Sequence, residues 1–531
     1  MKRMLLILVI LLMTAGTVFA GGRQSASASG AAQKLAVEVF DRGTDGGRSQ
    51  ANNNEWTRWI QQKVLRDLNI EVEFYAVGRW SESTDIVNLM SSGSAPDLCY
   101  TYNGNMVSFF REQGGIMNLA PYIDTFLPDM KKLLGEDPAL PGQDLIYRNR
   151  EPDTGRIYSL PNYKTYFAEH NVFIRKVWLD ALRLPLPKTT QEFYNALVAF
   201  RDRDPGNVGR NNVIPFGQDA NAGFGFMSVA HAFLDPNITN RDFWIQGFQR
   251  PYIMVPGFKD GIRLLNQWYN EGLILRDFPL LRVSDDFNNI LKSGVIGAYF
   301  GSWDNPWRGD YKVAEELAKN VPGAEFVAVD CIQSPVDGVT RKNASDKAGG
   351  ISIFIPAFSR NHEAALKYLN WLCLYENFNF LQLGTQGVNH EIVNGVPRIL
   401  SLPARHPWIM NSQNNIDYTL HLNGVELLNP DLNGRYVAMG YEGFSSDIIV
   451  NAYNTSMTNG RPPVVYQAVT TLGGVYGQTL SDKANALISQ AVIARPADFD
   501  RIWDAGIRDY LASGAQEIMD ERAALWPASR R

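Results

Sequence analysis

The amino-terminal part of this 531-residue sequence predicts an α/β fold built around parallel strands. An apolar run over 35–40 is followed by the amphipathic spacing of a helix over 56–68. An alternating strand pattern over 70–77 is followed by a helix over 82–91, and turn residues then lead into a third strand over 97–102. Because strands joined through helices pair in parallel with right-handed crossovers, this order predicts a parallel sheet.

The ends of two predicted helices carry recognisable signals. Ile60 and Val64 recur at helical spacing on the apolar face of the first helix, and Asn69 is suited to end it. Thr189 and Glu192 have the spacing of a capping box, which places the start of a later helix just after Thr189.

Composition indicates a globular protein with enough chain for two or three domains. The sequence is 45% hydrophobic and 20% charged, with a net charge of −5. This mild acidity gives no electrostatic reason to expect nucleic acid as a partner. Cys99, Cys331 and Cys373 are too few and too scattered for a disulfide framework. We expect buried free thiols, although one pair could bridge.

The amino-terminal segment predicts export. Two basic residues precede a short apolar run over 5–13, and small residues follow where a signal peptidase cuts, so residues 1–20 form a signal peptide cleaved near Ala20. The run is too short to span a bilayer. Residues 21–34, rich in Gly, Ser and Ala, are expected to be a flexible linker. With no cysteine at the cleavage point to carry a lipid, the expectation is a periplasmic or secreted protein that is not a lipoprotein.

Motifs of the common enzyme classes are missing from the sequence. It contains no HExxH, no GxSxG and no glycine-rich phosphate loop followed by lysine, and its six histidines lack metal-ligand spacing. No catalytic residue and no cofactor are therefore predicted. Two distant carboxylates could still meet across a cleft as a glycosidase pair, so a secreted polysaccharide-degrading enzyme, a lyase or glycosidase, stays open as the alternative.

Short motifs recur in one order along most of the chain. They are Asp41-Arg42-Gly43 after the first strand, EWTRWI over 55–60, NIEVEF over 69–74, SGSAPDL over 92–98, NVFIRKVWL over 171–179, NEGLI over 270–274, HEAALKYLNW over 362–371, GTQGVNH over 384–390 and the helix pair over 498–522. Together they resemble the extracellular solute-binding proteins (family 1) of carbohydrate ABC transporters. The resemblance is to a subgroup with long chains, which includes the alginate-oligosaccharide binders.

The resemblance implies the type II periplasmic-binding-protein-like fold. In that fold two α/β lobes are joined by a multi-strand hinge, and the ligand lies in the cleft between them. Lobe one is expected over 35–162 and 350–428, and lobe two over 163–349 and 429–531. Residues 163–169 would form the first crossing between the lobes. A second crossing is expected at the paired glycines of 349–352, which permit unusual backbone angles.

Polar residues at strand ends are the first candidates for the ligand site. Ligands of parallel sheets sit beyond the carboxyl ends of the strands, which places Asp41, Arg42 and Tyr102 at the edge of a cleft. Lys164 at the predicted hinge and Asp304 in a later loop could also bind hydroxyl groups.

Aromatic residues are the second set of candidates, because the apolar face of a sugar ring stacks on aromatic rings. In the resembling family a strand delivers an aromatic side chain to the cleft where this sequence has Trp303, with Trp307 close by. Both stand in a loop-like context of Gly, Asp, Asn and Pro, although either could instead be a core side chain. Tyr163 and Tyr166 at the hinge could stack or pack, and the segment with Tyr441 and Glu442 could close over the cleft; these last two complete the candidate set.

A calcium-type loop of the subgroup survives only in degenerate form. Asp204 stands at the first ligand position, but Gly206 and Val208 offer no side-chain oxygen at the third and fifth positions, and the twelfth lacks a bidentate glutamate. Asn207 and Asn212 are further remnants of the pattern. We expect a turn without metal.

These observations predict the substrate-binding component of an ABC importer that binds a carbohydrate, by its size an oligosaccharide, through hinge closure. Its expected partners are the sugar and the permease subunits of the inner membrane, and the chain is expected to be a monomer. A sensor or adhesion module with the same fold is a third possibility, after the enzyme.

Overall fold

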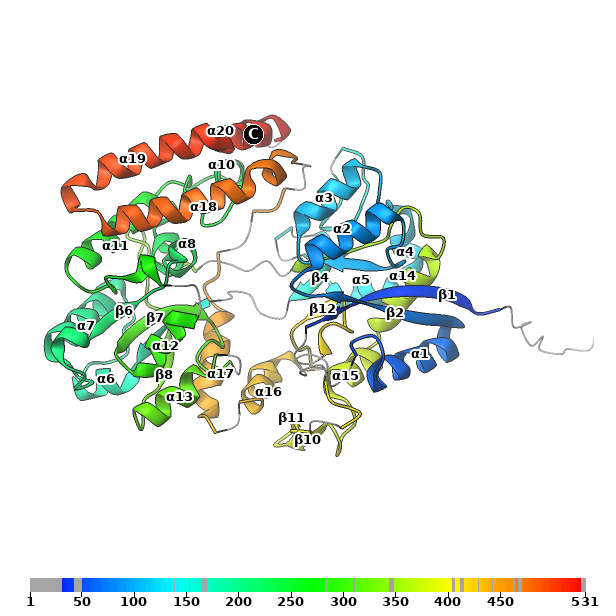
Figure 1. Cartoon of the computed structure of the whole chain (residues 1–531), viewed down its shortest axis with the longest axis horizontal. Helices are drawn as coiled ribbons and strands as arrows, with labels where there is room; N and C mark the ends of the chain where they lie inside the picture. The colour runs from blue at the N-terminus through cyan, green and yellow to red at the C-terminus, as the bar shows by residue number, and fades with distance from the viewer. Residues whose placement is uncertain are drawn as a thin grey trace, which may run out of the picture.

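The chain folds into two lobes that lie side by side, as the computed structural model in Figure 1 shows. The structure describes residues 31–42, 50–137, 139–140, 142–151, 153–164, 170–281, 285–308, 311–342, 348–403, 406–410, 415–427, 429–441, 443–461, 464–466 and 470–526. The signal peptide predicted over 1–20, most of the linker predicted over 21–34, and the candidate residues Tyr166 and Glu442 lie outside these ranges. Within them, no helix combines the length and the apolar character needed to cross a membrane.

Lobe one begins with the predicted alternation of strands and helices. The elements are β1 (Gln33–Asp41), α1 (Glu55–Leu68), β2 (Ile70–Gly78), α2 (Glu82–Ser92) and β3 (Cys99–Thr101). β1 and β2 pair in parallel along their whole length, and Leu98 bridges Val37 in parallel on the other side of β1. Asn69 ends α1 in the left-handed conformation. This part of the sequence-based prediction is confirmed.

A second sheet of lobe one is mixed, because it joins β3 to strands that the prediction for 35–102 did not cover. Its order is β12 (Leu422–Asn423), β4 (Leu160–Lys164), β9 (Ala348–Phe354) and β3. β9 is antiparallel to both β3 and β4, whereas β12 is parallel to β4. β9 returns to lobe one only after the chain has built much of lobe two, so local sequence could not reveal this pairing.

Helices and a hairpin complete lobe one. They are α3 (Gly104–Glu112), α4 (Ile123–Phe126), α5 (Pro128–Leu134), α14 (His362–Leu372), α15 (Tyr375–Leu383), β10 (His390–Val393) and β11 (Val396–Ile399). The two strands of the hairpin pair with each other in antiparallel register.

Lobe two is built around a four-stranded sheet. Its order is β6 (Ile214–Gly217), β7 (Ile296–Ser302), β5 (His170–Arg175) and β8 (Phe326–Val329). β6 and β7 are parallel, and β5 runs antiparallel to β7 and β8. The carboxyl ends of β6 and β7 therefore lie at the same edge as the start of β5.

Some helices of lobe two pack on this sheet and others pack on one another. They are α6 (Lys176–Ala181), α7 (Thr190–Arg203), α8 (Ala222–Gly225), α9 (Met227–Ala230), α10 (Asn240–Gln246), α11 (Phe258–Asn270), α12 (Asp285–Ser293), α13 (Val313–Asn320), α16 (Asn433–Met439), α17 (Ser446–Ser456), α18 (Leu472–Ile493), α19 (Phe499–Tyr510) and α20 (Gln516–Leu525). The capping box predicted at Thr189 and Glu192 is present at the start of α7.

Each lobe has its own main apolar core, and a smaller cluster of Leu383, Val396, Val425, Leu427 and Tyr436 joins lobe one to α16. One core draws its buried side chains from 35–160 and 351–420. Two further clusters, which share the sheet of lobe two, draw theirs from 172–332 and 438–518. The three cysteines are buried free thiols, as expected from the sequence.

Candidate functional site

Strand ends of lobe one bring two predicted residues together. Arg42 follows β1 and Tyr102 follows β3, and the Arg42 Nη2 donates to the Tyr102 Oη at 3.3 Å. The same guanidinium donates through Nε and Nη2 to the two carboxylate oxygens of Asp417, at 2.7 and 2.8 Å. Burial opposes the charge of Arg42, but these bonds to Asp417 raise its pKa above the ordinary value. Asp41, the last residue of β1, is exposed at the same edge.

An exposed aromatic stack, which sequence reasoning missed, continues this edge. Arg79 and Trp80 directly follow β2. The Arg79 guanidinium carbon lies 3.9 Å from the ring centre of Tyr102 and 5.0 Å from that of Trp80. Glu82 holds Arg79 through an ion pair of 3.1 Å. Trp80 is 82% exposed, so its indole face is open to a ligand. The rule that selected Arg42 and Tyr102, position just after a parallel strand, also applied to Arg79 and Trp80.

The predicted hinge residues lie next to this edge. Tyr163 pairs with Ala348 of β9, and Lys164 pairs with Asn423 of β12, so three strands that lead toward lobe two meet here. Gly350 has a φ of +110°, and a Cβ there would lie 3.3 Å from the Lys164 side chain. The positive φ therefore favours glycine at this point of β9.

Lobe two contributes a pocket of about 320 Å³ at the ends of β6 and β7. Its lining includes His170, Asp219, Phe224, Phe300, Arg308 and Tyr311. Phe224 is 38% exposed and packs against His170 and Phe300, with ring centres 4.5 and 5.8 Å apart. The wall therefore combines aromatic faces with charged and amide groups, a mixture typical of ligand pockets.

The two predicted stacking tryptophans occupy the core instead. Trp303 is 9% exposed and makes an edge contact with Tyr453, at 5.4 Å between ring centres. Trp307 is 7% exposed and packs edge-on against Phe173 at 6.0 Å. Neither lines the pocket. The turn that follows β7 folds back over the sheet. The two rings are therefore buried although the surrounding Gly, Asp, Asn and Pro residues are typical of a loop.

Asp304 and Tyr441 are also engaged within lobe two. Asp304 accepts from Arg308 at 2.6 and 3.2 Å and from the Tyr441 Oη at 3.4 Å. Arg308 in turn donates to the Ser302 Oγ at 3.1 Å and lines the pocket. The structure thus places Asp304 behind Arg308, as the group that orients it.

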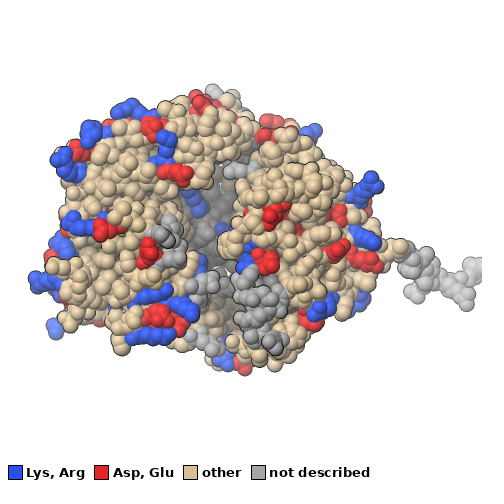
Figure 2. All heavy atoms as spheres, viewed as in Figure 1, with Lys and Arg blue, Asp and Glu red and all other residues tan. Residues whose placement is uncertain are grey.

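A second pocket, of about 380 Å³, spans the two lobes. Lobe one supplies Arg111, Glu151 and Tyr158, and lobe two supplies Tyr466 and Thr470 from the segment before α18. Figure 2 shows the molecule hollowed between the lobes. No local motif marks these residues, since they come from separate parts of the chain.

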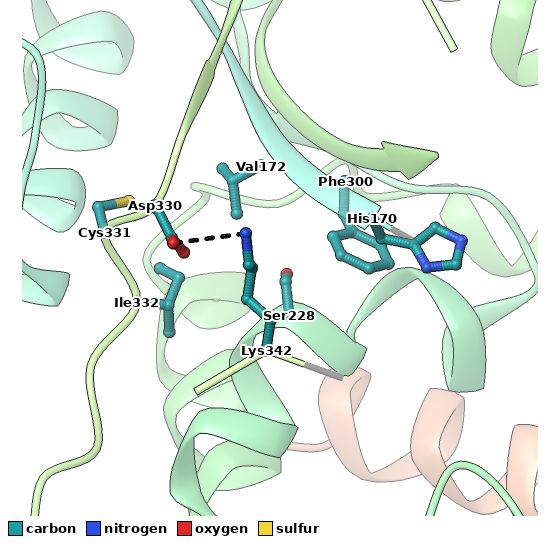
Figure 3. A pocket seen from close by; sticks show the side chains of 8 residues that line it. All are labelled: His170, Val172, Ser228, Phe300, Asp330, Cys331, Ile332 and Lys342. Carbon is teal, nitrogen blue, oxygen red and sulfur yellow. Dashed lines mark ion pairs between the residues drawn. The ribbon is translucent and has the colours of Figure 1, made fainter. Parts of the chain in front are cut away.

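A small enclosed cavity lies in lobe two beside His170 and Phe300 (Figure 3). Its volume of about 10 Å³ holds no more than a single water. Lys342 reaches into it and pairs with Asp330 at 3.4 Å. Burial lowers the pKa of Lys342. The backbone N–H of Lys342 also donates to the carbonyl of Asn459 at 2.7 Å, and its carbonyl accepts from the N–H of Arg461 at 2.9 Å, so residue 342 is held against the segment 459–461.

The degenerate calcium-type loop is closed by its own hydrogen bonds. The Asp204 carboxylate accepts from the backbone N–H groups of Val208 and Gly209, at 2.9 and 2.8 Å. The Asn212 side chain donates to the carbonyl of Val208 at 2.9 Å. Across the described ranges, no group of three or more His, Cys, Asp or Glu side chains is arranged to hold a metal ion.

Comparison with known sequences finds relatives among sugar-binding proteins, although no family model matches. The chain is 27% identical over 265 residues to the fructooligosaccharide ABC transporter substrate-binding protein FusA of Streptococcus pneumoniae, covering 46% of each chain. It is 22% identical over 309 residues to the polygalacturonan/rhamnogalacturonan-binding protein YtcQ of Bacillus subtilis, covering 57% of each. The matches thus span about half the length of these curated relatives.

Solved structures match nearly the whole chain. The alginate-binding protein AlgQ2 superposes with a TM-score of 0.61 at 18% identity, over 93% of this chain and 97% of that one. An HMO-binding solute-binding protein from Bifidobacterium longum infantis gives 0.61 at 18%, and FusA in complex with kestose gives 0.60 at 17%; each match covers 93% of this chain and 98% of the other. The resemblance is therefore confirmed: the chain has the two-domain fold of the solute-binding proteins, and its relatives include substrate-binding proteins of carbohydrate ABC transporters.

Proposed function

We propose that this protein is the substrate-binding component of an ABC importer and binds an oligosaccharide between its lobes. The observation that carries the proposal is that each lobe presents aromatic and charged groups at the ends of its strands, in a molecule that is hollowed between the lobes (Figure 2). Lobe one presents the exposed indole of Trp80 beside Arg42, and lobe two presents the pocket of Phe224 and Arg308. Aromatic faces next to fixed hydrogen-bonding groups suit sugars, whose rings are apolar on their faces and bear hydroxyls at their edges.

Closure of the lobes is the proposed mechanism of capture. In the open form the sugar reaches both walls of the cleft, and rotation about the connecting strands then brings the walls together. Excluding water strengthens the hydrogen bonds between the sugar hydroxyls and the charged groups. No covalent step is required, and the structural neighbours described above are binding proteins.

The remaining parts of the proposal concern location and partners. A protein exported by a signal peptide over 1–20, without a lipid anchor, would work in the periplasm as a monomer. There the closed form would be recognised by the permease subunits of the inner membrane. The domain limits predicted from the sequence remain part of the proposal, and the two main cores support them, although one small cluster crosses the limit at 428–429.

The test is a thermal-shift screen of mono- and oligosaccharides, followed by calorimetry and small-angle scattering on the best ligand. We expect saturable binding and a smaller radius of gyration in the complex. The same ligand is then incubated with the protein and examined chromatographically for cleavage. Sustained product formation would replace the importer with the polysaccharide-degrading enzyme.

A further inference from the structure

The arginines at the lobe-one edge are each neutralised by a carboxylate. Arg42 forms a two-pronged pair with Asp417, whose side chain is only 2% exposed. Arg79 pairs with Glu82, which also accepts from the backbone N–H of Tyr102 at 2.9 Å. Because these carboxylates are buried and held by several donors, the pairs are fixed parts of the fold.

The lobe-two pocket repeats the arrangement. Arg308 is its arginine, and both oxygens of Asp304 accept from it. Asp304 is 7% exposed, so it supports the guanidinium from within the protein. The pocket also contains Asp219, whose carboxylate accepts from the Gln218 side chain and the Asn221 backbone, both at 2.9 Å. Arg308 therefore brings no excess positive charge to this wall.

In the pocket between the lobes, each arginine is again paired with a carboxylate. The Arg111 Nη1 lies 3.6 Å from the Glu151 Oε1, and Arg148 is paired with the fully buried Asp137. The other polar groups of its lining are hydroxyls and an amide: Ser108, Asn149, Tyr158, Ser159, Ser352, Tyr466 and Thr470. Such groups donate and accept hydrogen bonds without net charge.

Throughout the described part of the cleft, every arginine at the lobe-one edge or in the two pockets thus has a carboxylate partner. Asp41 and Lys164 add one negative and one positive charge at the lobe-one edge. At each paired arginine, a ligand carboxylate would have to displace a buried partner or become desolvated without a new cation, and either costs free energy. The charge of Lys164 is balanced in sign by that of Asp41 at the same edge. A hydroxyl group meets neither penalty, since it can donate to the carboxylate and accept from the guanidinium of one pair.

We propose, resting on the function proposed above, that the ligand is an electrically neutral oligosaccharide and that the paired arginines make the cleft reject uronic acids. Arginine content alone would suggest the opposite, because unpaired guanidinium groups bind carboxylates. Pairing converts these side chains into rigid hydrogen-bonding groups for neutral hydroxyls.

Calorimetry on the full chain tests this with two probe sets: neutral gluco-, galacto- and fructo-oligosaccharides, and oligogalacturonides with alginate oligomers. The tightest ligand is then compared with a counterpart that differs only at C6. One member of the pair carries a hydroxymethyl group there and the other a carboxylate. We expect the neutral member to bind at least tenfold more tightly, because the acidic member brings a charge that the site does not compensate. The affinity of the neutral member should change less than twofold between 20 and 300 mM salt, because it carries no charge to screen.

Tighter binding of the acidic member would overturn the inference and leave the importer function standing. If no sugar of either set binds, the proposed function itself fails. The variant Asp417→Asn, which leaves Arg42 without its anion, should shift the neutral-to-acidic affinity ratio toward the acidic member by at least threefold. Asp337→Asn, which breaks an exposed pair with Arg341 outside both pockets, serves as the control and should leave the ratio unchanged. An unaltered ratio in Asp417→Asn would count against the role of pairing.

Discussion

The two lobes use the aromatic residues at their strand ends differently. On lobe one, Trp80 stands in solvent beside Arg79 and Tyr102. On lobe two, Trp303 and Trp307 follow β7 but turn inward, and the smaller ring of Phe224 is left to face the pocket. A tryptophan after a strand is thus left exposed in one lobe and buried in the other, according to the turn that follows it. Four predictions test this contrast, from the largest expected effect to the smallest.

Trp303→Ala should destabilise the protein more than any other single aromatic change at the cleft. Removing a buried indole packed against Tyr453 is expected to cost about 3–5 kcal/mol of unfolding free energy. Urea unfolding monitored by fluorescence measures this. A stability within about 0.5 kcal/mol of wild type would mean that the ring is not a core side chain, and would restore it as a stacking candidate.

Acid should weaken lobe one selectively through His421. This residue is fully buried beside the hinge strand β12, and burial lowers its pKa from 6.5 to about 3. Below pH 6.5 the unfolded chain takes up a proton that the folded lobe excludes, so stability falls as pH drops toward 3. At pH 4.5 the loss is roughly 2.7 kcal/mol, at 1.36 kcal/mol for each pH unit.

Hydrogen exchange at pH 7 and pH 4.5 measures this effect. Amides of β1 and β2 should lose more protection at pH 4.5 in the wild type than in the variant His421→Leu, a comparison that cancels the opposite contribution of Glu38, whose pKa is raised by burial. The variant His421→Leu removes the titrating group and should flatten the response of lobe one. Equal acid sensitivity of wild type and variant would assign the effect to other groups.

Trp80→Ala should reduce sugar affinity without affecting stability. Loss of an exposed stacking surface is expected to weaken binding about tenfold, or ~1.4 kcal/mol, while the unfolding midpoint stays constant. Leu280→Ala is a matched control, since Leu280 is also 82% exposed but lies outside both pockets. Calorimetry gives the affinity. If both variants bind like wild type, the lobe-one wall described here is not the sugar surface.

Phe224→Ala should have the smallest effect of the four. Its ring is partly shielded by His170 and Phe300, so we expect a threefold loss of affinity, or about 0.6 kcal/mol. The double variant with Trp80→Ala should show additive losses, because the two rings belong to different lobes. A larger loss than that of Trp80→Ala would reverse the ranking of the two walls.

Sequence reasoning succeeded where the structure follows from the local order of residues along the chain. The spacing of 35–102 predicted β1 to β3 with their helices, and the strand-end rule brought Arg42 next to Tyr102. It failed where partners come from distant segments. Asp417, which fixes Arg42, and Tyr466, which lines the pocket between the lobes, carry no motif. The inward turn after β7 also depends on packing of Trp307 against Phe173, which local composition does not encode.

The hydrogen bonds of Lys342 indicate which pocket-lining residues belong to the same lobe. This residue is bonded to Asn459 and Arg461, and the chain continues to Tyr466, whose hydroxyl donates to the carbonyl of Leu525 at 2.9 Å. Tyr466 is therefore attached to lobe two, whereas Glu151 in the lining of the same pocket belongs to lobe one. If the lobes close as proposed, the width of the pocket between them changes with the angle of closure. The pocket of Phe224 would keep its shape, because all its lining residues belong to lobe two.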